Sequence, residues 1–232
     1  MQAIDLGDWL TLIESKSDLL TCSDPSLSCG ETNLVWKALR LFRSIHQFPP
    51  VHLHLEKHIP VEAGLGGGSS NAATALWALN EFAGRPASLA DLSRLGASLG
   101  SDVPFFFSSG SAYCTGRGEQ VESVTLPKIC GTLEKPSYGL STPAVYRETR
   151  VKELAETDPQ ATLNTFLNGD PHYYNDLEPA AFRIIPELAS FKEGLQKSFK
   201  NVLMTGSGTA FFCFGGKTTF SSIYRDQGSW YQ

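Results

Sequence analysis

Paired cysteines, an excess of basic residues and long apolar runs are all missing from this sequence of 232 residues. Its five cysteines form no CxxC pair, so neither a disulfide framework nor a zinc site is expected, and a reducing compartment is indicated. Lysine and arginine total 19 against 24 acidic residues, and the net charge of −5 disfavours a nucleic-acid partner. No apolar stretch approaches the roughly 18 residues that would cross a membrane. The cysteines are Cys22, Cys29, Cys114, Cys130 and Cys213.

The composition and the pattern of apolar residues predict an α+β fold. A content of 41% hydrophobic and 19% charged residues is that of an ordinary globular protein. The first residues, MQAIDLGDWLTLIES, have no basic segment and no cleavable apolar core, so no targeting peptide is expected in the chain. Separate hairpins and helices, rather than regular strand–helix alternation, argue against a parallel sheet. We expect two lobes, at residues 1–130 and 131–232.

The expected secondary structure follows from periodicity and turn residues. Strands are expected at residues 9–14, 19–20 and 51–60, on both sides of a Ser-Ser-Gly turn within 103–119, and on both sides of a glycine turn within 201–215. Helices are expected to begin near Asn33, Ser69, Ser88 and Thr142, with two more within residues 175–196. Asp91 lies three residues after Ser88, the spacing of a capping box.

One segment, VEAGLGGGSSNAATALWALNEF at residues 61–82, places four glycines in five positions directly before a helical pattern. Glycine at this density costs conformational entropy, so we expect a specific reason for it, such as the close approach of a phosphate to the backbone. The free N–H groups at a helix N-terminus bind anions, and Ser69, Ser70 and Asn71 add side-chain donors. No Lys-Ser/Thr pair follows the last glycine, and the third glycine of GxGxxG is missing, so the segment is neither a Walker A loop nor a dinucleotide fingerprint. A flexible loop before a packed helix is the alternative.

Three segments together resemble the GHMP kinases, the small-molecule kinases named for galactose, homoserine, mevalonate and phosphomevalonate. PVEAGLGGGSSNAATALWALN resembles their phosphate loop, GSDVPFFFSSGSAYCTGRGE the stretch with their catalytic aspartate, and VLMTGSGTAFFCF their third glycine motif, which would line the cleft near the phosphates. GLSTPAVYR and NDLEPAAF resemble the branch that phosphorylates a cytidine-diphosphate-linked alcohol in the non-mevalonate isoprenoid pathway, and SAYCTGRGE is most similar to its plant and algal members. The resemblance runs from residue 3 to about residue 215. It implies a nucleotide-binding lobe like ribosomal protein S5 domain 2, followed by a ferredoxin-like substrate lobe.

The resemblance also implies ATP-dependent phosphorylation of an alcohol, with Mg²⁺ arriving on the nucleotide. Asp102 would orient or deprotonate the hydroxyl and contact the substrate, Thr142 would touch the substrate, and Tyr146 would stack on its cytosine. We expect ATP and this small molecule as partners, no membrane, a monomer or weak homodimer, and the plastid stroma for a plant or algal source or otherwise the cytoplasm. The implied ATP-binding residues are Asn33, Lys57, Pro60, Gly64, Leu65, Gly66, Gly67, Gly68, Ser69, Ser70 and Asn71.

Several of these residues have a structural alternative. Asp102 precedes Pro104 by two residues, and the proline is expected to hold Val103 in an extended conformation. Without the resemblance, Asp102 is a turn residue after a helix. Asn33 is equally well interpreted as a helix N-cap. For Tyr146 the alternative is a core aromatic.

For other conspicuous residues, a structural role competes with metal or ligand binding. His52 and His54 share a strand face, but this is the polar side of an alternating strand, so no metal ligands are predicted. Arg117 is as well explained by a solvated hairpin as by a phosphate contact, and the tryptophans of the predicted helices belong to the core. Thr142 is expected to cap its helix, with Pro143 at the first position.

The resemblance has one gap at its start. Members of this branch carry a KIN motif, with the catalytic lysine, and a GYH motif ahead of the segment that matches IDLGD, and this sequence shows no counterpart of either. The stretch at residues 125–136 is also shorter than theirs. A catalytically silent nucleotide-binding protein is therefore the first rival, and another GHMP small-molecule kinase the second. For the chain as written we expect at best a weak kinase.

Overall fold

A computed structural model describes residues 1–126, 130–169, 171–215 and 220–221. Contacts divide the chain into two compact units. The first unit holds residues 1–59 and 66–125, and the second holds residues 60–65 and the described chain from residue 126 onward. The glycine-rich segment therefore begins in the second unit and continues in the first. Both units combine helices with β-sheet, which confirms the predicted α+β class.

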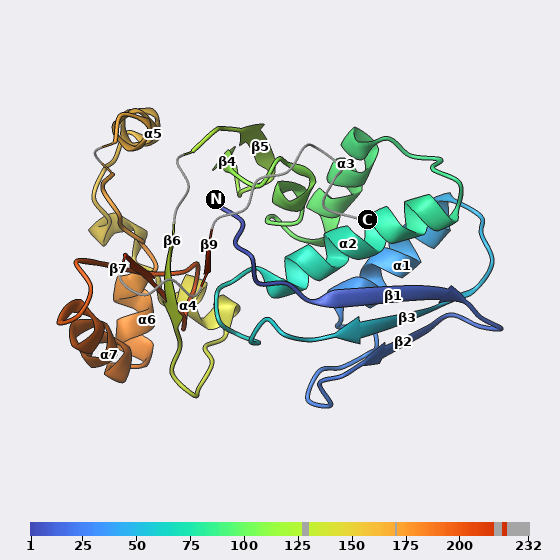
Figure 1. The fold of residues 1–232 in the computed structure, drawn as a ribbon, viewed down its shortest axis with the longest axis horizontal. Coiled ribbons are helices and arrows are strands. Elements are labelled where there is room, and N and C mark those ends of the chain that lie inside the picture. Colours follow the sequence, from blue (N-terminus) through green and yellow to red (C-terminus); the bar gives the residue numbers. More distant parts are fainter. Residues whose placement is uncertain (127–129, 170, 216–219, 222–232) are drawn as a thin grey trace. The chain divides into compact units, whose positions relative to one another are not determined.

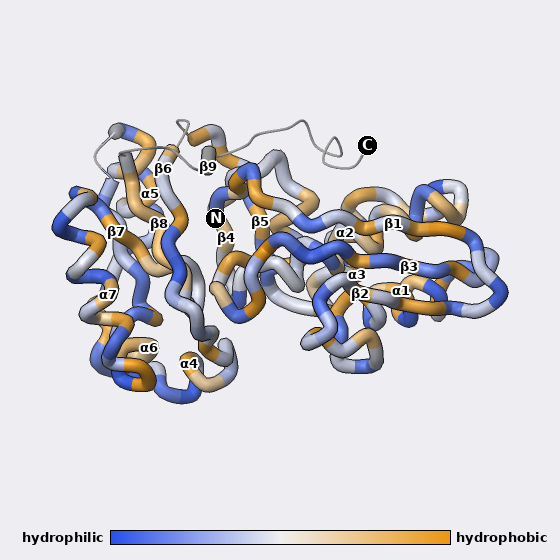
Figure 2. Tube along the Cα trace, turned by 60° about the horizontal axis from the view of Figure 1, so that its bottom comes forward, coloured by the Kyte–Doolittle hydropathy of each residue, from blue (hydrophilic) through white to orange (hydrophobic). Residues whose placement is uncertain are grey.

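The first unit is built on a three-stranded sheet of order β1-β3-β2. The central strand β3 (Val51–Glu56) pairs antiparallel with β1 (Trp9–Glu14) and parallel with β2 (Leu19–Cys22). Residues along β3 are alternately buried and more exposed, and its changing hydropathy can be followed in Figure 2. Figure 1 shows α1 (Leu34–Ile45) and α2 (Gly67–Phe82) on one face of this sheet. The core between them contains Val35, Leu39, Phe42, Leu53, Leu55, Leu76 and Leu79.

The rest of the first unit follows α2. Helix α3 (Leu89–Leu99) begins with the predicted capping box, in which Ser88 accepts from the Asp91 backbone and Asp91 accepts from the Ser88 backbone. Of the two strands expected around the Ser-Ser-Gly turn, the strand after it is confirmed, but the strand before it is wrong. Instead a short 3-10 helix, η1 (Pro104–Phe107), precedes a hairpin of β4 (Ala112–Thr115) and β5 (Gln120–Ser123) that turns at the Thr-Gly-Arg-Gly stretch.

The second unit is a four-stranded sheet of order β7-β8-β6-β9 with helices packed on it. All its described strand pairs are antiparallel. The patterns within residues 175–196 and 201–215 are confirmed as two helices and two strands, but β6 and α5 were not predicted. No helix in the described chain is both long enough and apolar enough to span a membrane. The elements are β6 (Cys130–Glu134), α4 (Thr142–Glu148), η2 (Val151–Glu153), α5 (Pro159–Leu167), α6 (Glu178–Ile184), α7 (Glu187–Gln196), β7 (Asn201–Met204), β8 (Phe211–Phe214) and β9 (Phe220–Ser221).

Candidate functional site

The N-terminus of α2 is an anion-binding arrangement. The helix begins at Gly67, two residues before the predicted start. Its N-cap, Gly66, has φ 68° in the left-handed region and supplies no side-chain cap. No residue of the first turn is acidic, so no carboxylate within that turn offsets the positive end of the helix dipole. A helix start of this kind favours a bound anion such as phosphate.

The glycines before α2 are required by packing as well as by conformation. A Cβ on Gly66 would lie 3.3 Å from Cζ of Phe106. A Cβ on Gly67 would lie 3.0 Å from Cγ2 of Ile59, three residues after the end of β3. The turn is therefore held tightly between neighbouring side chains, so the alternative of a flexible loop does not fit.

The first half of the glycine segment belongs to the second unit and packs on the TGSGT turn at residues 205–209. Gly64 has φ +72°, and a Cβ on it would lie only 2.0 Å from the carbonyl oxygen of Thr205. The backbone N–H of Ala210 donates to the carbonyl of Ala63 at 3.1 Å, and the N–H of Thr209 donates to the carbonyl of Glu62 at 3.2 Å. These contacts bring two glycine motifs, predicted separately from the sequence, into one structure.

Glu62, within the same segment, has the left-handed backbone angle φ 52° although it is not a glycine. The left-handed region costs an L-residue roughly 1–2 kcal/mol. This cost is larger than the roughly 0.4–1 kcal/mol by which the entropy of a glycine stabilises the unfolded chain. Glu62→Gly should therefore raise the free energy of unfolding by up to about 1 kcal/mol. Urea unfolding measures it, with Glu14→Gly in the extended strand β1 as a control that should lower stability. A loss of stability on Glu62→Gly would contradict the strain.

The expected substrate-contacting residues lie on α4 of the second unit. Thr142 is the first residue of α4 and not its cap, which is Ser141, and Pro143 is therefore the second residue. The Thr142 hydroxyl instead hydrogen-bonds the hydroxyl of Ser207 in the TGSGT turn at 2.7 Å. Tyr146 is 63% exposed, so its interpretation as a core aromatic is wrong. Its ring is available to stack on a planar ligand.

Asp102 lies in the first unit between α3 and η1. The expectation that Val103 is extended is wrong, because Val103 has helical angles of φ −62° and ψ −42° and is fully buried. A Cβ on Gly118 in the β4–β5 turn would lie 3.3 Å from Oδ1 of Asp102, so this carboxylate has a close backbone neighbour. The residue reaches solvent, yet burial of its carboxyl by the surrounding protein raises its pKa.

Residues 100–102 also approach the start of α2. A Cβ on Gly100 would lie 4.0 Å from the Ser69 hydroxyl oxygen in the first turn of that helix. The segment that carries Asp102 therefore runs beside the candidate anion site within the same unit.

Lys57 and Asn71 contact each other and Asp8. The Lys57 ammonium forms an ion pair with the Asp8 carboxylate and donates to Oδ1 of Asn71 at 3.2 Å. The side chain of Lys57 is only 9% exposed. Asn33 caps α1, with its side chain accepting from the Val35 backbone at 2.9 Å, so the N-cap interpretation is confirmed.

Hydrogen bonds and core packing involve the histidines of β3 and the two helix tryptophans. His52 and His54 both hydrogen-bond the Thr21 hydroxyl at 2.8 Å, and the described residues include no group of three or more His, Cys, Asp or Glu that would hold a metal ion. The side chain of Arg117 is 74% exposed at the hairpin. Trp36 and Trp77 both pack against the core of the first unit.

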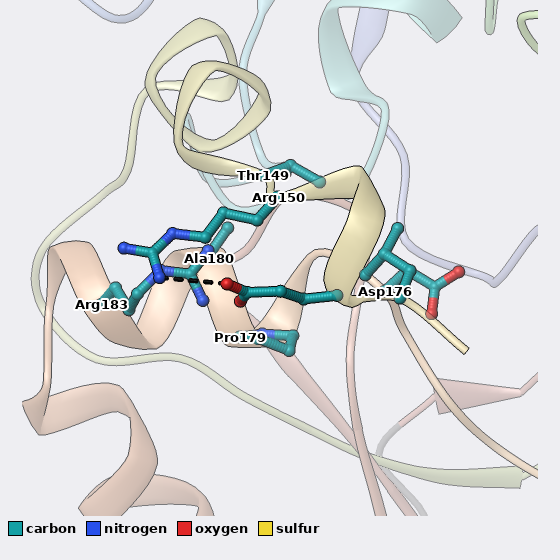
Figure 3. Close-up of a pocket in the computed structure, with 8 residues that line it drawn as sticks. Thr149, Arg150, Asp176, Pro179, Ala180 and Arg183 are labelled. Atoms are coloured by element: carbon teal, nitrogen blue, oxygen red, sulfur yellow. Dashed lines mark hydrogen bonds and ion pairs between the residues drawn. The ribbon is translucent and has the colours of Figure 1, made fainter.

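A small cavity in the second unit is a different feature. It has a volume of about 100 Å³ and lies between the end of α4, η2 and α6, as Figure 3 shows. Its guanidinium groups are already paired: Arg183 donates to Glu148 at 2.7 Å and Arg150 donates to Glu153 at 3.2 Å. These ion pairs leave no unpaired arginine in the cavity to receive a phosphate.

Known proteins resemble this chain in sequence and in fold. Residues 33–110 match the model of the GHMP kinases N terminal domain. The chain is 47% identical over 222 residues to 4-diphosphocytidyl-2-C-methyl-D-erythritol kinase of Protochlamydia amoebophila. The match covers 92% of this chain and 74% of that protein. The chain belongs to this family of kinases. A crystal structure of 4-(cytidine 5'-diphospho)-2C-methyl-D-erythritol kinase agrees, with a TM-score of 0.75 at 32% identity over 94% of this chain and 87% of that one.

Membership in the 4-diphosphocytidyl-2-C-methyl-D-erythritol kinases confirms the resemblance and the fold predicted from the three motifs. The chloroplastic kinase of the same name from Oryza sativa subsp. japonica is 40% identical over 237 residues. That match covers 96% of this chain, and the chain spans 59% of the rice protein's length.

Three residues that contact the residues singled out above were not predicted from the sequence. Asp8 binds Lys57 and Asn71, and Gly118 borders Asp102. Asn175 donates to the carbonyls of Met204 at 2.8 Å and Gly206 at 2.7 Å, and so holds the TGSGT turn. The NDLEP segment was a signal for Asn175, because asparagine side chains in turns often hydrogen-bond the backbone.

Proposed function

We propose that this protein transfers the γ-phosphoryl group of ATP to the 2-hydroxyl of 4-diphosphocytidyl-2-C-methyl-D-erythritol, in the non-mevalonate route to isoprenoid precursors. The observation that carries the proposal is the uncapped N-terminus of α2 after left-handed Gly66. It supports phosphate binding in a chain whose relatives at 38–47% identity are named for this kinase. Phosphoryl transfer depends mainly on positioning and charge stabilisation, which such a helix start supplies.

In this proposal the backbone around α2 holds the nucleotide. The phosphates bind the N–H groups that follow Gly66, and the hydroxyls of Ser69 and Ser70 add donors. Asn33 is proposed as a further contact to the nucleotide. The remaining residues of the proposed ATP site are Lys57, Pro60, Gly64, Leu65, Gly67, Gly68 and Asn71.

The acceptor alcohol is proposed to meet Asp102. Its carboxylate orients the hydroxyl or takes its proton as the phosphoryl group is transferred. Thr142 contacts the substrate, and the exposed ring of Tyr146 stacks on its cytosine. The N-terminal lobe is then the nucleotide lobe and the C-terminal lobe the substrate lobe.

Mg²⁺ is proposed to arrive bound to the ATP phosphates. Hard divalent cations of this size keep several water ligands and commonly bind through substrate phosphates, so a dedicated cluster of carboxylates is not required. The ion neutralises charge that develops on the phosphate oxygens. The chain's own contribution is to fix the phosphates against the first turn of α2.

The setting of the enzyme is proposed from its relatives. Those from Oryza sativa, Mentha piperita and Arabidopsis thaliana are named chloroplastic. We place this protein in the plastid stroma if its source is a plant or alga, and otherwise in the cytoplasm. We propose a monomer or weak homodimer that binds no nucleic acid.

An alcohol-dependent kinase assay tests the function. ADP release from Mg·ATP should depend on 4-diphosphocytidyl-2-C-methyl-D-erythritol, and ³¹P spectra should show a new phosphate monoester. Binding of ATP without any transfer would favour the silent nucleotide-binding rival. Transfer to mevalonate or homoserine, with none to the cytidine compound, would favour another GHMP kinase.

A substitution in the first turn of α2 tests the nucleotide site. Gly67→Val should weaken ATP binding more than tenfold, or about 1.4 kcal/mol, because its branched side chain collides with Ile59 and Lys57 and so displaces the first turn of α2. Calorimetric titration measures the affinity, with thermal unfolding to verify that the variant is folded. Gly194→Ala is the control, since a Cβ on Gly194 in α7 meets nothing within 4 Å. Equal affinity of Gly67→Val and unmodified protein would count against the site.

A further inference from the structure

The carboxylate of Asp8 uses both oxygens at the point where β3 ends. Its Oδ1 accepts the backbone N–H of His58 at 2.6 Å and of Ile59 at 2.8 Å. Its Oδ2 accepts the amide of Asn71 at 2.9 Å and pairs with the Lys57 ammonium. The Asp8 side chain is fully buried. One carboxylate thus joins the exit of β3 to the first turns of α2.

A second carboxylate, that of Asp18, fixes the opposite end of β3 in a similar way, away from the glycine-rich segment. Asp18 accepts the backbone N–H of Val51 at 3.0 Å, and pairs with the Arg43 guanidinium at 2.6 Å. Its side chain is 20% exposed. Both ends of the strand are therefore fixed by a carboxylate, a cation and a backbone amide, and only the Asp8 end adjoins the candidate phosphate site.

The location of the Lys57 ammonium explains why a carboxylate is needed there. A Cβ on Gly67 would lie 3.4 Å from Nζ of Lys57, so the ammonium sits beside the first residue of α2. A cation at the positive end of a helix dipole is unfavourable. Asp8 compensates this charge. Burial by itself would raise the pKa of the Asp8 carboxyl, but hydrogen bonds from Lys57, Ile59, His58 and Asn71 outweigh it and lower the pKa.

We propose that Asp8 is a positioning residue for the nucleotide. It holds the Lys57 ammonium and the Asn71 amide beside the first turn of α2 and fixes the strand exit at His58 and Ile59. The helix amides are then already placed when the phosphates arrive, so less ordering has to accompany binding. This role rests on the proposed function of the site.

The test compares Asp8→Asn with the matched control Asp18→Asn. In Asp8→Asn an amide N–H₂ faces the Lys57 ammonium and the Asn71 amide, so the cation loses its anionic partner. We expect the Kd of a non-hydrolysable ATP analogue and the KM for ATP to rise at least about tenfold. The KM for the alcohol and kcat should change less than about threefold. Asp18→Asn should lower the stability comparably and leave the KM for ATP unchanged.

A double variant that also removes the lysine charge keeps the test valid if Asp8→Asn alone folds poorly. Lys57→Met in the Asp8→Asn background removes the unpaired ammonium, so this double variant should be more stable than Asp8→Asn. Because Lys57 is itself a proposed nucleotide residue, the ATP affinity of the double variant should stay as low as that of Asp8→Asn or lower. An unchanged KM for ATP in a folded Asp8→Asn or double variant would overturn the positioning role. So would an equal rise in Asp18→Asn. Failure of the unmodified chain to bind the analogue would instead overturn the proposed function on which this role depends.

Discussion

Replacing Asp102 by asparagine should lower kcat by a factor on the order of 100 or more and leave the affinity for ATP within about threefold of the unmodified protein. The side chain keeps its shape but can no longer accept the proton of the substrate hydroxyl. Steady-state kinetics give kcat, and calorimetry with a non-hydrolysable ATP analogue gives the affinity. Asp24→Asn is the control, because Asp24 is an exposed carboxylate bonded to Ser26 in the same unit.

The pH profile of the same variant gives an independent readout. Burial raises the pKa of Asp102, so kcat should fall as the pH drops through a value above that of an ordinary aspartate. Below that pH the carboxyl is protonated and cannot act as a base. Asp102→Asn should lose this acid limb. Retention of more than about a tenth of kcat, with the acid limb intact, would remove Asp102 from the reaction.

The largest expected loss of stability follows Gly64→Ala. The new methyl group would lie 2.0 Å from the carbonyl oxygen of Thr205, and φ +72° is unfavourable for alanine. Overpacking and left-handed strain together should lower the free energy of unfolding by roughly 3 kcal/mol. Chemical denaturation followed by circular dichroism measures the change.

The matched control for that variant is Gly169→Ala in the same unit. Gly169 also has a positive φ, of 83°, but a Cβ there meets nothing within 4 Å. Alanine at this position should cost only about 1 kcal/mol, the strain without the collision. Similar losses for the two variants would show that the Thr205 contact is not a tight one.

The features predicted correctly from the sequence are those encoded by neighbouring residues. The capping box needs only Ser88 and Asp91 three positions apart. The helix after the glycine segment needs only its alanine-rich pattern. The cap at Asn33 is local in the same way. The three family motifs are also continuous segments, which is why the kinase family was predictable.

The features that were missed depend on contacts between distant residues. The preference of a residue before proline for an extended backbone failed at Val103, because its side chain packs against Gly96 of α3 and is buried there. A Cβ on Gly96 would lie 2.7 Å from Cγ1 of Val103, so only glycine admits this packing. Asp8 had no local signal either, since its partner Asn71 is 63 positions away.

The position of residues 60–65 in the second unit has a consequence for biosynthesis. The Thr205 hydroxyl donates to the carbonyl of Ala63 across 142 positions of sequence. At about 5–20 residues per second, the ribosome makes the TGSGT turn roughly 10–30 seconds after Ala63. During that interval the carbonyls of Glu62 and Ala63 lack their final donors, while β3 and α2 on either side can already pack. Residues 60–65 are thus expected to be among the last parts of the nascent chain to reach their final form.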